Sequence, residues 1–213
     1  MPPAIRKRDL LTGALALAVA PPALAASKPM ILTMLGDSIT AGFGLPSGDA
    51  LPAQLEAELH RRGVKVKVRA AGVSGDTSAD GLARTDFSVK SDTDLCFVFL
   101  GANDLLQGVD PKTTRANLQA ILAKLKARHI PAMLAGMRAP PVIGAGYAHD
   151  FDAIFPDAAH AAGVPYFPDL LGGVMSRSPL NQADGIHPNP QGVKIIVARL
   201  APAVASALKS RPR

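Results

Sequence analysis

Short apolar segments alternate with segments of helical periodicity along most of this chain, and this alternation constrains its fold more than any other feature. The strand-like segments are residues 30–35, 64–69, 94–100, 131–135 and 164–167. Between the first two, Leu51, Leu55 and Leu59 recur at every fourth position, which places them on one face of a helix. Apolar strands alternating with helices predict a parallel sheet that is covered by helices on both faces.

The connections between the strands predict how this sheet is wound. Right-handed crossovers leave a doubly wound sheet as the default. With five strands, we expect a flavodoxin-like three-layer α/β/α architecture with strand order 2-1-3-4-5. Two helices should begin at an N-cap followed by proline, at Asp110-Pro111 and at Asn189-Pro190. We expect Pro202 to kink or break the last helix, and residues 26–213 to form a single domain.

Residues 1–25 have the pattern of a signal peptide. Arg6-Lys7-Arg8 supplies a basic start, residues 10–20 are apolar, and Ala23-Leu24-Ala25 fits a cleavage site. The apolar stretch is too short to span a bilayer. Lys7-Arg8 also resembles a loose twin-arginine signal. We therefore expect an exported protein, periplasmic or secreted, with no stable membrane insertion after cleavage; the export route stays open between the two pathways.

Composition argues against several classes of site. Because the chain has a single cysteine, Cys96, an intramolecular disulfide and a cysteine zinc cluster are excluded. Cys96 lies in an apolar run, which favours a buried, inert thiol in the core. The formal net charge is +6, but the basic residues are scattered and aromatic residues make up 4%, so we expect no nucleic-acid partner. No glycine-rich nucleotide loop occurs. A metal site at His149, beside Asp150 and Asp152, is the alternative that we favour least. We expect no metal and no cofactor, and the oligomeric state is open.

Four segments interrupt the regular pattern, and each lies just after a strand or just before a helix. They are residues 36–38, 71–77, 101–104 and 184–188. Ligands of open α/β sheets bind beyond the carboxyl ends of the strands, so the expected winding brings all four segments to one edge. Each has a simpler interpretation by itself. Asp37 or Ser38 could cap the next helix, Gly75 could be a turn glycine, and Asn103 could form a local turn.

Taken together, these segments contain the parts of a nucleophilic centre. A serine hydroxyl needs a base at neutral pH, and histidine is the usual one. Three of the five histidines lie near the ends of expected helices, where the helix dipole alone explains them: His60, His129 and His160. His187 instead lies in a loop, three residues after Asp184. A carboxylate at this spacing can fix the imidazole tautomer and leave its other nitrogen facing a serine. An Asp-x-x-His pair before a helix is weak evidence when taken alone, so at this point Ser38, Asp184 and His187 are candidates for a catalytic triad.

Acyl transfer also needs hydrogen-bond donors for the negative charge that develops on the carbonyl oxygen. Gly75 can bring its backbone N–H close to a ligand because it has no side chain. Asn103 can offer its side-chain amide at the end of the third strand. We therefore expect Gly75 and Asn103 to contribute to an oxyanion hole.

These four segments, in this order and spacing, resemble the four blocks of the SGNH, or GDSL, hydrolase family. The quoted motifs are Gly36-Asp37-Ser38, Ser74-Gly75-Asp76-Thr77, Gly101-Ala102-Asn103-Asp104 and Asp184-Gly185-Ile186-His187-Pro188. The resemblance is greatest to the compact bacterial periplasmic arylesterase, thioesterase and lysophospholipase branch. It implies Ser38 as nucleophile, His187 as base, Asp184 as its orienting acid, and the Ser38 N–H as a third oxyanion donor beside Gly75 and Asn103. That branch often has glycine where this chain has Ala102.

The expected function is that of a secreted serine esterase which hydrolyses acyl esters or thioesters through an acyl-enzyme. Apolar residues in three segments, 105–106, 136–146 and 170–180, favour a small-molecule substrate with an acyl chain or an aromatic leaving group. A carbohydrate O-acetyl esterase is the enzymatic alternative, although the chain has no tryptophan and two tyrosines for sugar stacking. A non-catalytic binding protein on the same fold is the alternative from another class.

Overall fold

The computed structural model describes residues 28–210, and in it five parallel strands form one sheet in the order β2-β1-β3-β4-β5. The strands are β1 (Met30–Gly36), β2 (Val66–Gly72), β3 (Leu95–Phe99), β4 (Ala132–Ala135) and β5 (Tyr166–Phe167). Gly36 pairs with Gly72 of β2 and with Phe99 of β3, so three neighbouring strands end at the same level. The predicted architecture and strand order are confirmed, and the loops that follow these strands share one edge.

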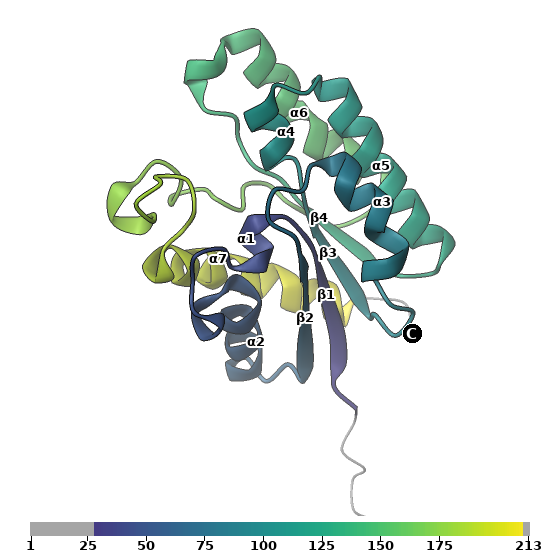
Figure 1. The fold of residues 1–213 in the computed structure, drawn as a ribbon. Coiled ribbons are helices and arrows are strands. Elements are labelled where there is room, and N and C mark those ends of the chain that lie inside the picture. The colour runs from purple at the N-terminus through teal and green to yellow at the C-terminus, as the bar shows by residue number, and fades with distance from the viewer. Residues whose placement is uncertain (1–27, 211–213) are drawn as a thin grey trace, which may run out of the picture.

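Helices cover both faces of the sheet (Figure 1). One face carries α2 (Leu51–Arg61) and α7 (Pro190–Lys209), which pack against each other. The other face carries α3 (Ser78–Ser88), α5 (Pro111–Ala127) and α6 (Ala145–Ala162). The short helices are α1 (Ser38–Ala41) and α4 (Ala102–Gln107), with 3-10 turns η1 (Ser47–Asp49), η2 (Pro141–Ile143) and η3 (Ser178–Leu180). Both α1 and α4 directly follow a central strand, at the edge where the predicted site lies.

The predicted apolar stripes face the interior. Leu51, Leu55 and Leu59 of α2 are buried, and so is every residue of β3. Cys96 lies within that strand, and burial raises the pKa of its thiol to about 12. The cysteine is therefore an uncharged thiol at neutral pH, which agrees with its interpretation as a core residue.

The sequence predicts a kink or a break of the last helix at Pro202, and the structure shows that the helix does not break there. α7 begins at the expected Asn189 cap but continues through Pro202 to Lys209. Pro202 cannot donate to the Ala198 carbonyl, yet both residues lie on the exposed side of the helix, where water can satisfy that carbonyl. The buried face, which includes Leu200 and Val204, holds the helix against the core on either side of the proline.

Strand boundaries also differ from the expectations by one to three residues. β2 runs to Gly72, two residues into a segment that the sequence predicts as loop, because Ala71 and Gly72 continue the pairing with β1. β5 is reduced to two residues.

The predicted signal peptide, residues 1–25, lies outside the described residues. Within them, α7 has the length and hydropathy of a membrane span, but about half of it is buried inside the domain.

Candidate active site

Ser38 is the first residue of α1 and lies directly beyond the carboxyl end of β1. The residue before it, Asp37, is the N-cap of this helix, and its Oδ1 accepts a hydrogen bond of 3.0 Å from the Ile39 N–H. The capping role that the sequence allows therefore belongs to Asp37. The Ser38 hydroxyl is left for a different partner.

That partner is His187, whose Nε2 lies 2.9 Å from Ser38 Oγ although 149 positions separate the two residues. On the other side of the ring, His187 Nδ1 lies 2.6 Å from Asp184 Oδ2. The second carboxylate oxygen of Asp184 accepts the backbone N–H groups of Ile186 at 2.9 Å and His187 at 3.0 Å. The structure thus brings Ser38, His187 and Asp184 into one hydrogen-bonded row.

The charge on Asp184 determines the tautomer of His187. Hydrogen bonds from the His187 ring and from two backbone N–H groups lower the pKa of Asp184 to about 2. Asp184 is therefore a carboxylate at neutral pH and can only accept, so the proton of a neutral His187 ring lies on Nδ1. Nε2 is then free to accept the hydroxyl proton of Ser38.

Two further residues hold the His187 loop in place, and the sequence analysis did not identify either. The Phe43 ring lies beside the imidazole, with 4.7 Å between the ring centroids. The side-chain amide of Gln182 donates to the Phe43 carbonyl at 2.8 Å and to the Pro188 carbonyl at 3.1 Å, and its backbone N–H donates to the His187 carbonyl at 2.8 Å. Gln182 therefore ties the loop after β1 to the histidine loop. An aromatic residue between Gly42 and Gly44 is the sequence signal that could have drawn attention to Phe43.

The two predicted oxyanion donors lie in neighbouring loops that contact each other. Asn103, in the first turn of α4, donates through Nδ2 to the Asp76 carbonyl at 2.8 Å. Because a carbonyl can only accept, this bond fixes the amide orientation and leaves the second Nδ2 hydrogen for another acceptor. Gly75 directly precedes Asp76 and has φ of +90°, and a Cβ built on it would meet no atom within 4 Å. The space beside its Cα is therefore open, and its positive φ is a conformation that favours glycine.

A buried carboxylate fixes the helix that carries Asn103. Asp104 accepts the backbone N–H of Ser78 at 2.7 Å, the Ser78 hydroxyl at 2.5 Å and the Thr114 hydroxyl at 3.0 Å. Since Ser78 begins α3 and Thr114 lies in α5, this network joins α4 to both helices. Asn103 is therefore attached to a rigid part of the domain.

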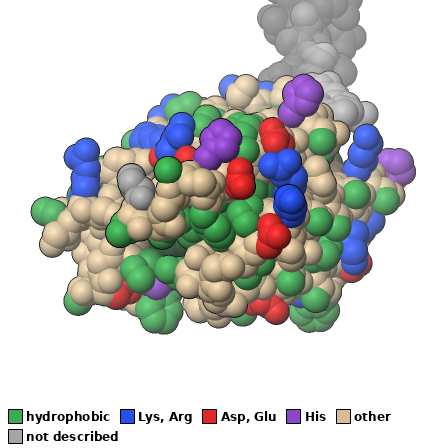
Figure 2. Space-filling model, turned by 90° about the horizontal axis from the view of Figure 1, so that it is seen from above, with side chains coloured by type: hydrophobic (Ala, Val, Ile, Leu, Met, Phe, Trp, Pro, Cys, Tyr) green, Lys and Arg blue, Asp and Glu red, His purple; other side chains and the backbone are tan. Residues whose placement is uncertain are grey.

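Exposed apolar side chains gather on the face that carries the row of polar residues. Figure 2 looks down on this face and shows hydrophobic side chains around a hollow in its middle. Most of the large exposed hydrophobic residues lie in loops or helices that follow strands: Phe43, Val73, Leu106, Val142, Ile143 and Ile186. Part of the expected lining is wrong, however. Leu170, Leu171 and Val174 are buried in the core, where the segment after β5 is bonded to Arg199 of α7 and to the Gly136 carbonyl.

The part of the chain between residues 28 and 210 contains no group of three or more histidine, cysteine, aspartate or glutamate residues that could hold a metal ion. His149 is exposed in α6. Asp152, which the least favoured alternative places in a metal site with His149 and Asp150, instead accepts the Ala139 N–H at 2.8 Å. The polar groups of the site are thus arranged around a hydroxyl and an imidazole.

Comparison with known proteins agrees with this arrangement. Residues 34–195 match the model of the GDSL-like lipase/acylhydrolase family. The chain belongs to this family. Esterase TesA of Pseudomonas aeruginosa is 36% identical over 183 residues, which cover 84% of this chain and 88% of that protein. Thioesterase 1/protease 1/lysophospholipase L1 of Escherichia coli is 37% identical over 159 residues, covering 74% and 75% of the two chains.

Similarity to a solved structure extends the agreement to three dimensions. The crystal structure of AlinE4, an SGNH-hydrolase family esterase, superposes with a TM-score of 0.72 at 41% identity, covering 86% of this chain and 98% of that one. The resemblance to the GDSL family that the four sequence blocks indicate is confirmed, and so is the predicted class of ester hydrolase at the level of the family.

Proposed function

We propose that this member of the GDSL-like family is an exported serine esterase that hydrolyses acyl esters or thioesters through an acyl-enzyme, with Ser38 as the nucleophile. The observation that carries the proposal is the hydrogen-bonded row from Ser38 Oγ through His187 to Asp184, at 2.9 and 2.6 Å. Hydroxyl, base and orienting carboxylate in this order are the constellation of nucleophilic acyl transfer.

The reaction follows from the tautomer of His187. Ser38 Oγ attacks the carbonyl carbon while its proton passes to His187 Nε2, and Asp184 stabilises the imidazolium that forms. The imidazolium then returns the proton to the leaving oxygen or sulfur, and the acyl group stays on Ser38. In the second half, His187 takes a proton from water, the resulting hydroxide attacks the acyl-enzyme, and Ser38 leaves with the proton from Nε2 as the acid is released.

Three donors would bind the oxyanion of the two tetrahedral intermediates. These are the Gly75 N–H, the free Nδ2 hydrogen of Asn103 and the Ser38 N–H. The Ser38 N–H belongs to the first turn of a helix, which has no acceptor for it within the helix. A preorganised hole of this kind supplies a large part of the rate enhancement in acyl transfer, since its donors need no reorientation when the charge develops.

The surroundings of Ser38 favour an apolar acyl or aryl group. Phe43 is half exposed beside the imidazole, and Val73, Leu106 and Ile186 add exposed apolar surface on the same face. Burying such surface against a substrate contributes about 25 cal/mol per Å². The names of the relatives, which include esterase, thioesterase and lysophospholipase, agree with an acyl substrate.

The same proposal includes export. Residues 1–25 would be removed as a signal peptide, leaving a single catalytic domain from residue 26. The mass of the protein purified from the periplasm of an expressing bacterium should correspond to a chain that begins at Ala26. A full-length chain in the cytoplasm alone would contradict this part.

Hydrolysis of p-nitrophenyl esters from acetate to palmitate, with Ser38→Ala as the control, tests the catalytic part. We expect the wild type to hydrolyse the series, with an optimum that reports the acyl length, and Ser38→Ala to be inactive. If folded wild type leaves every ester intact, the acyl-ester proposal is wrong; a sugar O-acetyl ester and a direct binding assay then decide between the two alternatives.

A further inference from the structure

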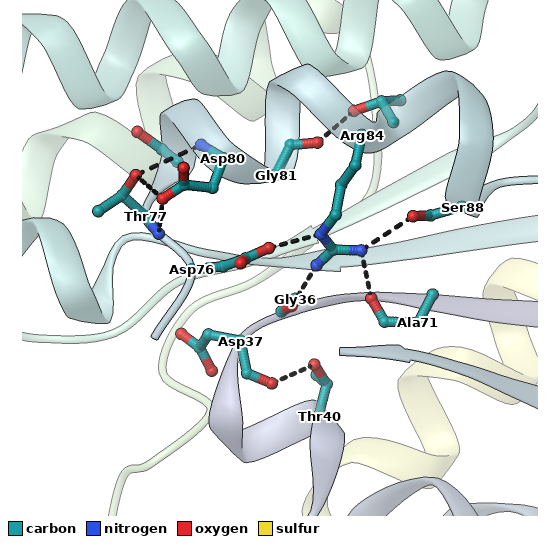
Figure 3. Close-up of polar contacts among 12 residues, drawn as sticks. Gly36, Asp37, Thr40, Ala71, Asp76, Thr77, Asp80, Gly81, Arg84 and Ser88 are labelled. Carbon is teal, nitrogen blue, oxygen red and sulfur yellow. Dashed lines mark hydrogen bonds and ion pairs between the residues drawn. The ribbon is translucent and has the colours of Figure 1, made fainter. Parts of the chain in front are cut away.

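Arg84 in α3 directs its guanidinium toward the sheet rather than toward solvent (Figure 3). Its Nε donates to Asp76 Oδ2 at 2.5 Å and its Nη2 to the Gly36 carbonyl at 2.7 Å. Its Nη1 donates to the Ala71 carbonyl at 2.7 Å and to the Ser88 hydroxyl at 3.0 Å. The side chain is 18% exposed and that of Asp76 is 11% exposed, so this ion pair is largely shielded from water.

Each of the main partners of Arg84 belongs to a segment that carries an oxyanion donor. Gly36 ends β1, two residues before Ser38. Asp76 follows Gly75 directly, and its carbonyl accepts the Asn103 amide at 2.8 Å. One side chain is therefore bonded to the strand end that presents Ser38 and to the residue that joins Gly75 to Asn103.

The loop that carries Gly75 has few other contacts of its own. The Val73 N–H donates to the Gly36 carbonyl at 3.0 Å, and the Asp76 N–H closes a turn on the Val73 carbonyl at 3.2 Å. Gly75 has open space where a side chain would be. The Asn103 amide ties the Asp76 carbonyl to α4, and the bonds of Arg84 to the Asp76 carboxylate and the Gly36 carbonyl tie the end of this turn to β1.

We propose that Arg84 is a positioning residue of the oxyanion hole: by bridging Asp76 to the ends of β1 and β2, it holds the Gly75 and Asn103 donors in register with Ser38. The inference rests on the proposed function, because it concerns the same reaction. Arg84 does not touch the substrate. It acts through Asp76 and through the Gly36 carbonyl.

The planar guanidinium is essential to this role. Four of its N–H groups donate to four different acceptors: a carboxylate, two strand carbonyls and a hydroxyl. A lysine ammonium keeps the positive charge but offers one nitrogen, so it cannot join all of these acceptors. Arg84→Lys therefore removes the bridging hydrogen bonds while it keeps the positive charge.

The control is Arg128, which is bonded in a similar way to the C-terminal end of α3. Its Nη2 donates to the carbonyl of Val89, the C-cap of α3, at 2.5 Å, and its Nη1 to Asp86 at 3.3 Å. Arg128→Lys removes a comparable bridge and should lower stability by a similar amount, because it replaces the same kind of fork in a partly buried position. It leaves the loop of Gly75 untouched.

The test compares kcat and KM for p-nitrophenyl esters in wild type, Arg84→Lys and Arg128→Lys, each shown to be folded by circular dichroism and thermal unfolding. A small displacement of catalytic groups can cost about 100-fold in rate, so we expect kcat of Arg84→Lys to fall about 10- to 100-fold. KM should change less than about twofold, because the oxyanion exists only in the transition state. Arg128→Lys should keep kcat within about twofold of wild type, since it does not affect the oxyanion donors.

The inhibition constant (Ki) of a trifluoromethyl ketone is a second measurement, and a loss of stability alone would not change it. The tetrahedral adduct of this ketone with Ser38 places an oxyanion in the hole, so the Ki should rise in Arg84→Lys by the same factor as kcat/KM falls. The inference is wrong if kcat of folded Arg84→Lys stays within twofold of wild type, if Arg128→Lys loses as much activity, or if Ki does not change.

The two proposals fail in different ways. Wild type that does not hydrolyse esters, or Ser38→Ala that is as active as wild type, overturns the proposed function. Ser38-dependent hydrolysis that Arg84→Lys leaves intact overturns only the role of Arg84. If Arg84→Lys does not fold, Asp76→Asn replaces it, because this change removes the charged partner of Arg84 while it keeps the Asp76 carbonyl that accepts Asn103. The same losses are expected, and an unchanged kcat overturns the inference.

Discussion

The buried carboxyl group of Asp37 gives a prediction about stability and pH. The side chain is fully buried, and its Oδ2 has no hydrogen-bond partner among residues 28–210. The pKa of Asp37 is raised from 3.8 to about 7, mainly because the group is buried and to a smaller extent because the carboxylates of Asp76 and Asp104 lie nearby, against the opposing effect of the Ile39 N–H. The folded protein therefore binds a proton at Asp37 over a pH range in which the unfolded chain has released it.

The sign and size of the effect follow from this difference. Where the folded state binds more protons, the free energy of unfolding falls as pH rises. Because one pKa unit corresponds to about 1.4 kcal/mol, the ionisation of Asp37 lowers the free energy of unfolding by about 4 kcal/mol in total once the pH exceeds 7. More than half of this loss falls between pH 5 and pH 8.

Asp37→Asn removes the ionisation and keeps the helix cap, since asparagine is an equally good N-cap. Urea unfolding of wild type and Asp37→Asn at pH 5, 6, 7 and 8 measures the effect. Asp150→Asn, at an exposed position of α6, is the control for the loss of one charge. We expect the stability of Asp37→Asn relative to wild type to increase by about 2 to 3 kcal/mol from pH 5 to pH 8. A difference that is constant with pH, or that matches the control, would refute the reasoning.

Three further variants test the site and the core. Asn103→Ala should lower kcat about 10²- to 10³-fold with little change in KM, because one oxyanion donor is lost; steady-state kinetics that show less than a tenfold fall would contradict this role. Asp184→Asn should lower kcat about 10²- to 10⁴-fold, because the amide no longer fixes the His187 tautomer; the same assay checks it, and activity close to wild type would show that the carboxylate is dispensable. Phe151→Ala should lower the free energy of unfolding by about 3–5 kcal/mol in urea titrations, because it leaves a cavity beside Phe155; a loss below about 1 kcal/mol would show that the site collapses.

The fold was predictable because its main determinants are local. Apolar strands, the helical stripe of Leu51, Leu55 and Leu59, and the Asn189-Pro190 helix start each act over a few residues. The outcome at Pro202 depends instead on which side of the helix faces water, and this becomes clear only once α7 is packed. The limits of β2 depend on pairing with β1, which extends the strand through Ala71 and Gly72.

The candidate site likewise combines residues that the local sequence identifies with residues whose role depends on the packed structure. Ser38, Asp184 and His187 could be identified because each follows a strand or precedes a helix in a polar, glycine-containing loop. Arg84 could not, because an arginine within an amphipathic helix is indistinguishable from a solvated surface residue until its partners are known. The same holds for Gln182, whose bonds to Phe43 and Pro188 join segments that are far apart in sequence.

The most direct test of the account is to find where a fluorophosphonate reacts. The reagent phosphonylates a serine that a neighbouring base activates, and peptide mass spectrometry locates the adduct. We predict one adduct per chain, on Ser38, that is absent from Ser38→Ala and forms far more slowly in His187→Ala. An adduct on another residue, or an active protein that the reagent leaves unlabelled, would contradict the central claim that Ser38 is the nucleophile.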